Sequence, residues 1–175
     1  QAKLSLEKAI EANPYSLKAK LLLSDTLSAS DAISYLYDII DNQTSVSSNE
    51  ADLTTIYRKL GILLSTENPS DALSFLSSDD EEQIIAQYRC YSTLGDWKKA
   101  KSCSDKLLDL NSKNLTGWLL SGWASFKNQD YTEAQKSFEA ALATSPDNNE
   151  SILGLISTLE KSNQETSHLT SILDF

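Results

Sequence analysis

The residue types that most often perform catalysis or bind metal ions are scarce in this sequence. Its thiols are Cys90 and Cys103, and its one imidazole is that of His168. These residues form no Cys-x-x-Cys pair, and structural zinc sites need four nitrogen or sulfur ligands. A single histidine near the C-terminus offers no Ser-His-Asp arrangement. We therefore expect no catalytic residue, no metal site and no cofactor. A disulfide stays open as an alternative to two reduced, partly buried thiols on neighbouring helices.

Phosphate-binding glycine motifs are also missing from the sequence, which contains neither Gly-x-Gly-x-x-Gly nor Gly-x-x-x-x-Gly-Lys-Ser/Thr. The acidic run at residues 79–82 (DDEE) could serve a metal ion or a basic partner. The preferred interpretation is helix capping, because acidic side chains stabilise a helix N-terminus and a helix is expected to begin at Glu81. Ser77 and Ser78 precede this run in a pattern that resembles an acidophilic kinase target. A phosphate there would add about −1.5 to −2 charges at a helix start.

The composition is that of an acidic globular chain. Among 175 residues, Lys and Arg total 15 and Asp and Glu total 25, for a net charge of −10. Such a chain repels phosphate backbones, so we expect no direct nucleic-acid binding. No apolar run approaches the length of about 18 residues that marks a membrane-spanning helix, so we expect no membrane span. With 5 Gly and 3 Pro, the chain has few of the residues that hairpins need, which argues against an all-β fold. It contains no Met and no signal-peptide pattern, and we expect it to be a piece of a longer protein.

The sequence repeats itself. Residues 94–100 (LGDWKKA) resemble residues 128–134 (NQDYTEA), so that Ala100 matches Ala134 at a spacing within the range of structural repeats. A third copy lies at the start, where the matching residues are Ala2, Leu6, Ala9, Ile10 and Pro14 against Ala134, Phe138, Ala141, Leu142 and Pro146. Between the turns, apolar residues recur three and four positions apart, which is the helical period. The repeat unit is therefore a pair of antiparallel helices joined by a short polar turn.

This pattern resembles the tetratricopeptide repeat family. Its motif places an aromatic residue, a Gly, a Gly-Asp-Tyr-type turn, and then Ala, an aromatic residue, Ala and Pro at fixed spacing. The best copy here supplies Trp118, Gly122, Asp130, Tyr131, Ala134, Phe138, Ala141 and Pro146. A second copy, at the family's period of about 34 residues, supplies Tyr91, Gly95, Asp96, Trp97 and Ala100.

These motif positions have physical roles. The small residues Gly122 and Ala134 let the two helices approach closely, and Trp118 and Phe138 fill the layer between them. Pro146 ends the second helix, because proline cannot continue the hydrogen-bond ladder.

The resemblance implies an all-α fold, a tetratricopeptide-type α-solenoid of antiparallel helix pairs that is partly degenerate and cut from a longer array. Residues 1–175 are expected to form a single solenoid: a half repeat at 1–14, degenerate repeats at 15–48 and 50–80, good repeats at 81–114 and 115–148, and a weak terminal repeat at 149–175 with Leu155 and Leu159 in the core. In the degenerate part we expect helices at 16–27, 31–41, 50–64 and 70–76, and a loop at 42–49. Their pairing is expected to be irregular, and neither end looks capped, so further helices or a partner are expected to cover both ends.

The family implies a binding groove, in which the first helices of successive repeats line a concave face. Carried onto this sequence, the groove residues are Thr54, Tyr57, Gly61 and Leu64; Glu82, Ile85, Arg89 and Ser92; Thr116, Leu119, Trp123 and Phe126; Glu150, Leu153, Ser157 and Glu160. The predicted partner-binding residues are Tyr57, Ile85, Arg89, Leu119, Trp123, Phe126, Lys127 and Leu153. Exposed apolar patches commonly mark interaction sites, and Arg89 with Lys127 nearby could hold a partner carboxylate. The alternative, that Trp123 and Phe126 belong to the core, stays open.

The resemblance implies a non-catalytic protein–protein interaction scaffold in a larger protein or complex, located in the cytoplasm or nucleus. The expected partner is a peptide segment or a neighbouring subunit. Chaperone-binding members grip a terminal carboxylate with a Lys and Asn pair on one groove helix. The matching positions here carry no such pair, so we expect no chaperone-tail clamp. Two alternatives remain: a structural or substrate-recruiting arm of a multidomain enzyme, and a self-association module that makes contacts through the uncapped ends.

Overall fold

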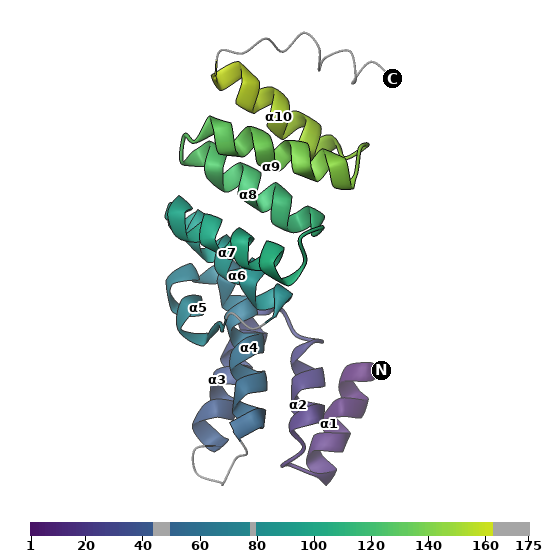
Figure 1. Ribbon diagram of the computed structural model, residues 1–175. Helices are drawn as coiled ribbons and strands as arrows, with labels where there is room; N and C mark the ends of the chain where they lie inside the picture. Colours follow the sequence, from purple (N-terminus) through teal and green to yellow (C-terminus); the bar gives the residue numbers. More distant parts are fainter. Residues whose placement is uncertain (44–49, 78–79, 163–175) are drawn as a thin grey trace. The chain divides into compact units, whose positions relative to one another are not determined.

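The computed structural model describes residues 1–43, 50–77 and 80–162. Within these ranges the chain forms ten α-helices and no strand, which confirms the all-α prediction. The helices belong to two compact units, Gln1–Leu76 and Ser77–Phe175 (Figure 1). We call them unit 1 and unit 2 and describe each by itself.

Unit 1 contains five helices of unequal length: α1 (Ala2–Ala12), α2 (Leu17–Ser24), α3 (Ala29–Gln43), α4 (Glu50–Glu67) and α5 (Pro69–Phe75). Its main contact is between α4 and α5, while α2 packs more closely on α1 than on α3. The side chains of Leu36, Ile56 and Leu60 are fully buried, whereas α1 contains no buried residue. The pairing is thus irregular, as expected for the degenerate repeats.

Two polar devices hold unit 1 together. Asn68 caps α5 and Pro69 begins it, in agreement with the known tolerance of a helix start for proline. The Lys59 ammonium on α4 donates to the Leu21 carbonyl at 2.7 Å and pairs with Asp25 at 2.6 Å. Because a helix C-terminus carries unsatisfied carbonyls, this lysine both caps α2 and ties it to α4.

Several predicted boundaries in unit 1 need correction. The second helix ends at Ser24 instead of residue 27, and the fourth continues to Glu67, three residues beyond the prediction. The predicted loop at 42–49 is helical at its first two residues, and residues 44–49 lie outside the described part.

Unit 2 is regular. Its helices are α6 (Glu81–Thr93), α7 (Trp97–Leu110), α8 (Leu115–Lys127), α9 (Tyr131–Thr144) and α10 (Asn149–Lys161). Each packs on the next, and α10 also touches α8 (Figure 1). Every one begins with an acidic or amide side chain that accepts a backbone N–H, the caps being Asp80, Asp96, Asn114, Asp130 and Asn148.

The turn inside each good repeat has the same backbone. Gly95 has φ +75°, and Gln129, at the equivalent position of the next repeat, has φ +66°. A left-handed residue after a helix is a common way to end it. The equivalence confirms the predicted repeat spacing, and it shows that glutamine adopts this conformation where the earlier repeat uses glycine.

The core of unit 2 is built around Phe138. Its fully buried ring lies against two glycines: a Cβ on Gly122 would come within 2.6 Å of it, and a Cβ on Gly154 would overlap it. Ala134 is also fully buried, so the predicted close contact between the helices is confirmed. The predicted core residues Leu155 and Leu159 are buried in the same cluster.

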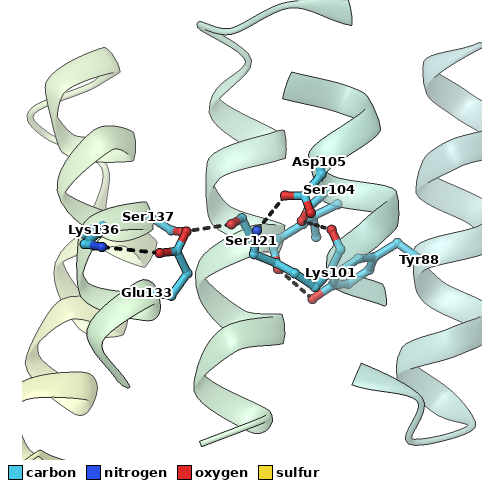
Figure 2. Close-up of polar contacts among 9 residues, drawn as sticks. Tyr88, Lys101, Ser104, Asp105, Ser121, Glu133, Lys136 and Ser137 are labelled. Atoms are coloured by element: carbon cyan, nitrogen blue, oxygen red, sulfur yellow. Dashed lines mark hydrogen bonds and ion pairs between the residues drawn. The ribbon is translucent and has the colours of Figure 1, made fainter. Parts of the chain in front are cut away.

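Hydrogen bonds also connect the helices of unit 2 (Figure 2). The hydroxyls of Ser121 on α8 and Ser137 on α9 are 2.8 Å apart, and the Tyr88 hydroxyl on α6 donates to the Leu120 carbonyl on α8 at 3.1 Å. Buried hydroxyls need such partners, so these contacts select one register between the helices. The predicted core residue Trp118 is half-buried, and its indole N–H donates to the Ser112 carbonyl at 3.0 Å.

Candidate protein-interaction surface

The first helix of the best repeat, α8, is apolar on more than one side. Trp123 and Phe126 are both half-buried, and their rings meet edge to face with centroids 5.8 Å apart. Trp123 also meets the buried Phe138 ring at 5.1 Å, and Phe126 meets Tyr131 at 5.7 Å. Edge-to-face contacts of this kind are favourable and orient the rings. The two predicted binding residues therefore belong partly to the core and partly to the surface.

Trp123 is also fixed by a polar contact with α10. Its indole N–H donates to the carboxylate of Glu150 at 3.0 Å. Glu150 is exposed, and Leu153, three residues later on the same helix, is 54% exposed. Residues three apart on a helix share a face, so Leu153 lies on the same face of α10 as the carboxylate that the Trp123 indole holds.

Leu119 and Leu153 occupy equivalent positions in consecutive repeats, but their environments differ. Leu119 is only 9% exposed and lies in the core cluster that contains Leu155 and Leu159 of α10. The prediction that Leu119 lines an open groove is therefore wrong: the next repeat covers it. In the described part of the chain, no helix covers Leu153 in the same way.

The other predicted binding residues of unit 2 lie on α6 and at the end of α8. Ile85 is half-buried and packs against the core formed by α6 and α7. Arg89 and Lys127 are exposed. Lys127 lies in the last turn of α8, where a positive charge is stabilised by the helix dipole.

In unit 1, the predicted groove register of α4 is wrong. Gly61 and Leu64 are buried, and a Cβ on Gly61 would come within 2.9 Å of Leu76. Tyr57 is half-buried and its ring packs against Phe75 on α5, with centroids 5.7 Å apart. The spacing of Tyr57 and Gly61 equals that of Trp118 and Gly122, and this match is the sequence signal that places Tyr57 on the packed side of the helix.

The acidic run is explained by helix capping where the structure describes it. The Asp80 carboxylate accepts the backbone N–H of Gln83 at 3.0 Å and its side-chain amide at 2.7 Å. Gln83 in turn accepts the backbone N–H of Ser77 at 3.0 Å. Ser78 and Asp79 lie outside the described residues, so the predicted phosphorylation stays a prediction.

The buried thiols and the buried Tyr88 hydroxyl of unit 2 have raised pKa values. Both cysteines are free and buried, on the neighbouring helices α6 and α7, as predicted. Burial raises the pKa of Cys90 and raises that of Cys103 to about 11. The pKa of Tyr88 is raised to about 12, first by burial and then by Cys103 and Glu150. Reactive thiols need a lowered pKa, so neither cysteine suits nucleophilic chemistry.

The described residues contain no group of three or more metal-ligating side chains, and His168 lies outside them. None of the described helices has the length and apolar character needed to span a membrane.

The repeat geometry agrees with a known family. Residues 115–148, which form α8, α9 and the turn after them, match the family described as tetratricopeptide repeat. Over these residues the chain is similar to that family. No curated protein matches the chain.

Solved structures share the tetratricopeptide fold over most of the chain. YrrB, described as a TPR protein with an unusual peptide-binding site, is 16% identical with a TM-score of 0.69, covering 97% of this chain and 89% of YrrB. BtubC from P. vanneervenii is 13% identical with a TM-score of 0.66, covering 93% of this chain and 80% of BtubC. The TPR2AB domain of yeast Sti1, solved in complex with pHSP90, is 13% identical with a TM-score of 0.51, covering 98% of this chain and 80% of that one.

Proposed function

We propose that this chain is a non-catalytic protein-interaction scaffold that works within a larger protein or complex. A segment of a partner protein binds along the first helices of unit 2, with apolar contacts to Trp123, Phe126 and Leu153. Arg89 and Lys127 supply positive charge for a partner carboxylate. Leu119 and Tyr57 leave the predicted set because both pack inside the fold.

One observation supports this proposal most strongly. An oriented aromatic pair, Trp123 and Phe126, remains partly exposed on α8, and Leu153 on α10 is 54% exposed. Aromatic side chains held rigidly at a surface lose little entropy on binding and dominate the energetics of many interfaces. Among the structural neighbours, YrrB is described by its peptide-binding site and the Sti1 domain by its complex with pHSP90.

The side chains at the clamp positions differ from those of a terminal-carboxylate clamp. At the positions of the clamp pair, the first helices of unit 2 carry Ile85 with Arg89, Leu119 with Trp123, and Leu153 with Ser157. None supplies the lysine and asparagine that grip a carboxylate. The proposed mode is an apolar contact along a helix face, with charges at its edge.

Trp123→Ala tests the proposal, with Trp118→Ala as a matched control on the same helix. The thermal melting curve of each variant would be recorded. Folded samples of each variant would then be tested for binding to an array of dodecapeptides of varied sequence. We expect Trp123→Ala to weaken binding of the peptides retained by the parent by about 2 kcal/mol or more while its helix content stays near that of the parent. Trp118→Ala is expected to lower the melting temperature and to retain the same peptides.

The opposite pattern would contradict the proposal. If Trp123→Ala bound the same peptides with normal affinity and melted at a lower temperature, Trp123 would be a core residue only, with a cost of about 3–5 kcal/mol.

A further inference from the structure

Trp123, Glu150 and Leu153 form a composite surface on α8 and α10, which we call the Trp–Glu–Leu site. The indole N–H of Trp123 holds one carboxylate oxygen of Glu150 at 3.0 Å. The ring of Trp123 is itself held by Phe138 and Phe126. The carboxylate is therefore anchored by a group that is rigid, although Glu150 is exposed.

The Glu150 carboxylate brings a negative charge to this site. Its contact with α8 is with the neutral indole N–H of Trp123, and the ion pairs of Lys59, Lys99, Lys101 and Lys136 involve other carboxylates. The whole chain carries a net charge of −10. An oriented carboxylate of this kind, on an acidic protein, is complementary to a cation on the binding segment.

We infer that the Trp–Glu–Leu site recognises an arginine side chain of the bound segment, an inference that rests on the proposed function of this surface. A guanidinium donates to the second oxygen of Glu150, lies against the indole of Trp123, and places its aliphatic stem on Leu153. Arginine fits better than lysine because its planar guanidinium forms directed hydrogen bonds with carboxylates and stacks on aromatic rings, whereas an ammonium is compact and strongly hydrated.

The neighbouring residues determine which side chains should flank the arginine in the bound segment. Lys127 lies in the last turn of α8, so a segment with an arginine at Glu150 and a carboxylate further along would meet charges of both signs. Leu153 and Phe126 then require apolar residues next to the arginine. The partner is thus a segment of mixed charge with an arginine beside apolar side chains, and not a simple polybasic tail.

Matched peptide pairs test this inference. Each pair on the array is a dodecapeptide with a central arginine and a copy with citrulline, which keeps the shape and loses the charge. For the peptides that bind, we expect the parent chain to prefer arginine over citrulline by about fivefold, the upper end for an exposed ion pair. Glu150→Gln should abolish the preference, while Glu139→Gln, at an exposed glutamate of α9 outside the predicted groove, should keep it.

An NMR readout locates the contact. The indole N–H signal of Trp123, assigned by its loss in Trp123→Phe, should shift on addition of an arginine peptide and shift less with its citrulline copy. Equal binding of arginine and citrulline copies, or a preference that survives Glu150→Gln, would overturn the inference and leave the proposed function standing. Failure of every peptide on the array to bind would overturn both.

Discussion

Unit 2 and unit 1 contain helix pairs of the same general kind, but they are stabilised in different ways. In unit 2 the same devices recur from one repeat to the next: a side-chain cap, a left-handed turn residue at Gly95 and Gln129, and a tight contact at a helical glycine. The described part of unit 1 also has caps at Ser16 and Asn68 and a tight contact at Gly61, but it has no left-handed turn residue. Single contacts join its helices instead, such as Lys59 on the end of α2 and the ring of Phe75 between Tyr37 and Tyr57.

The difference shows what a repeat needs in order to be regular. Small residues at the helix contact fix how closely two helices approach, and caps fix where each helix begins. Where both recur between copies within one chain, each copy presents the same surface to the next. Where they vary, as in unit 1, the helices differ in length and the pairing shifts.

Removal of the Phe138 ring should produce the largest difference in stability between the two units. Phe138 is fully buried between two glycines, whereas Phe75 in unit 1 is only half-buried. We expect Phe138→Ala to cost about 3–5 kcal/mol of unfolding free energy and Phe75→Ala distinctly less. Urea unfolding followed by circular dichroism measures both. Equal losses would mean that the two units have equally packed cores.

Alkaline pH should weaken unit 2 in particular. In the folded chain burial raises the pKa of Tyr88 to about 12 and that of Cys103 to about 11, from ordinary values of 10.0 and 9.0. Because the unfolded chain releases these protons first, the contribution of the two groups to stability is constant well below pH 9 and falls as the pH rises towards 12, by up to about 3 kcal/mol for each group.

Tyr88→Phe provides the control for this pH dependence. It should flatten the decline above pH 10, at a neutral-pH cost of about 1 kcal/mol for the lost hydrogen bond to Leu120. Denaturant melts at several pH values check the slope, and an unchanged slope in Tyr88→Phe would exclude this residue as the cause.

Replacement of a helical glycine by alanine should destabilise unit 2 more than unit 1. Gly122→Ala forces a methyl group onto the buried Phe138 ring, and we expect a loss of about 1–3 kcal/mol. At Gly61 the added methyl group would come within 2.9 Å of Leu76, a less severe approach than the one to Phe138, so Gly61→Ala should cost less. Thermal melts of the two variants measure the difference. If Gly122→Ala stabilised the chain, as alanine does in an open helix, the contact with Phe138 would be loose.

The smallest expected effect concerns two lysines of similar exposure. The Lys59 side chain is 22% exposed and joins two helices, whereas Lys101 is 25% exposed and pairs with Asp105 on its own helix. Lys59→Met should cost about 1–2 kcal/mol because a charged hydrogen bond to a helix terminus is lost. Lys101→Met should cost about 0.3–0.5 kcal/mol, as expected for a pair within one helix. A larger loss for Lys101→Met would show that the link between α2 and α4 adds nothing.

Much of the fold could be predicted from local sequence. The helical period, the regular spacing of the repeats, the small residues Gly122 and Ala134, and the proline that follows α9 are all visible along the chain. The chemistry of the caps is local as well, since Asp80 bonds to the backbone only three residues later. These properties depend on backbone geometry and side-chain size, which can be inferred from the residue types along the chain.

The tertiary structure decided which faces of the helices stay open. Leu119 and Leu153 are the same residue at the same repeat position, yet 9% and 54% of their surfaces are exposed. The contact between Trp123 and Glu150 joins residues 27 positions apart, and no local pattern predicts it. A side chain at the edge of a helix is buried or exposed according to the neighbouring helix, and that neighbour is positioned by packing between distant parts of the chain.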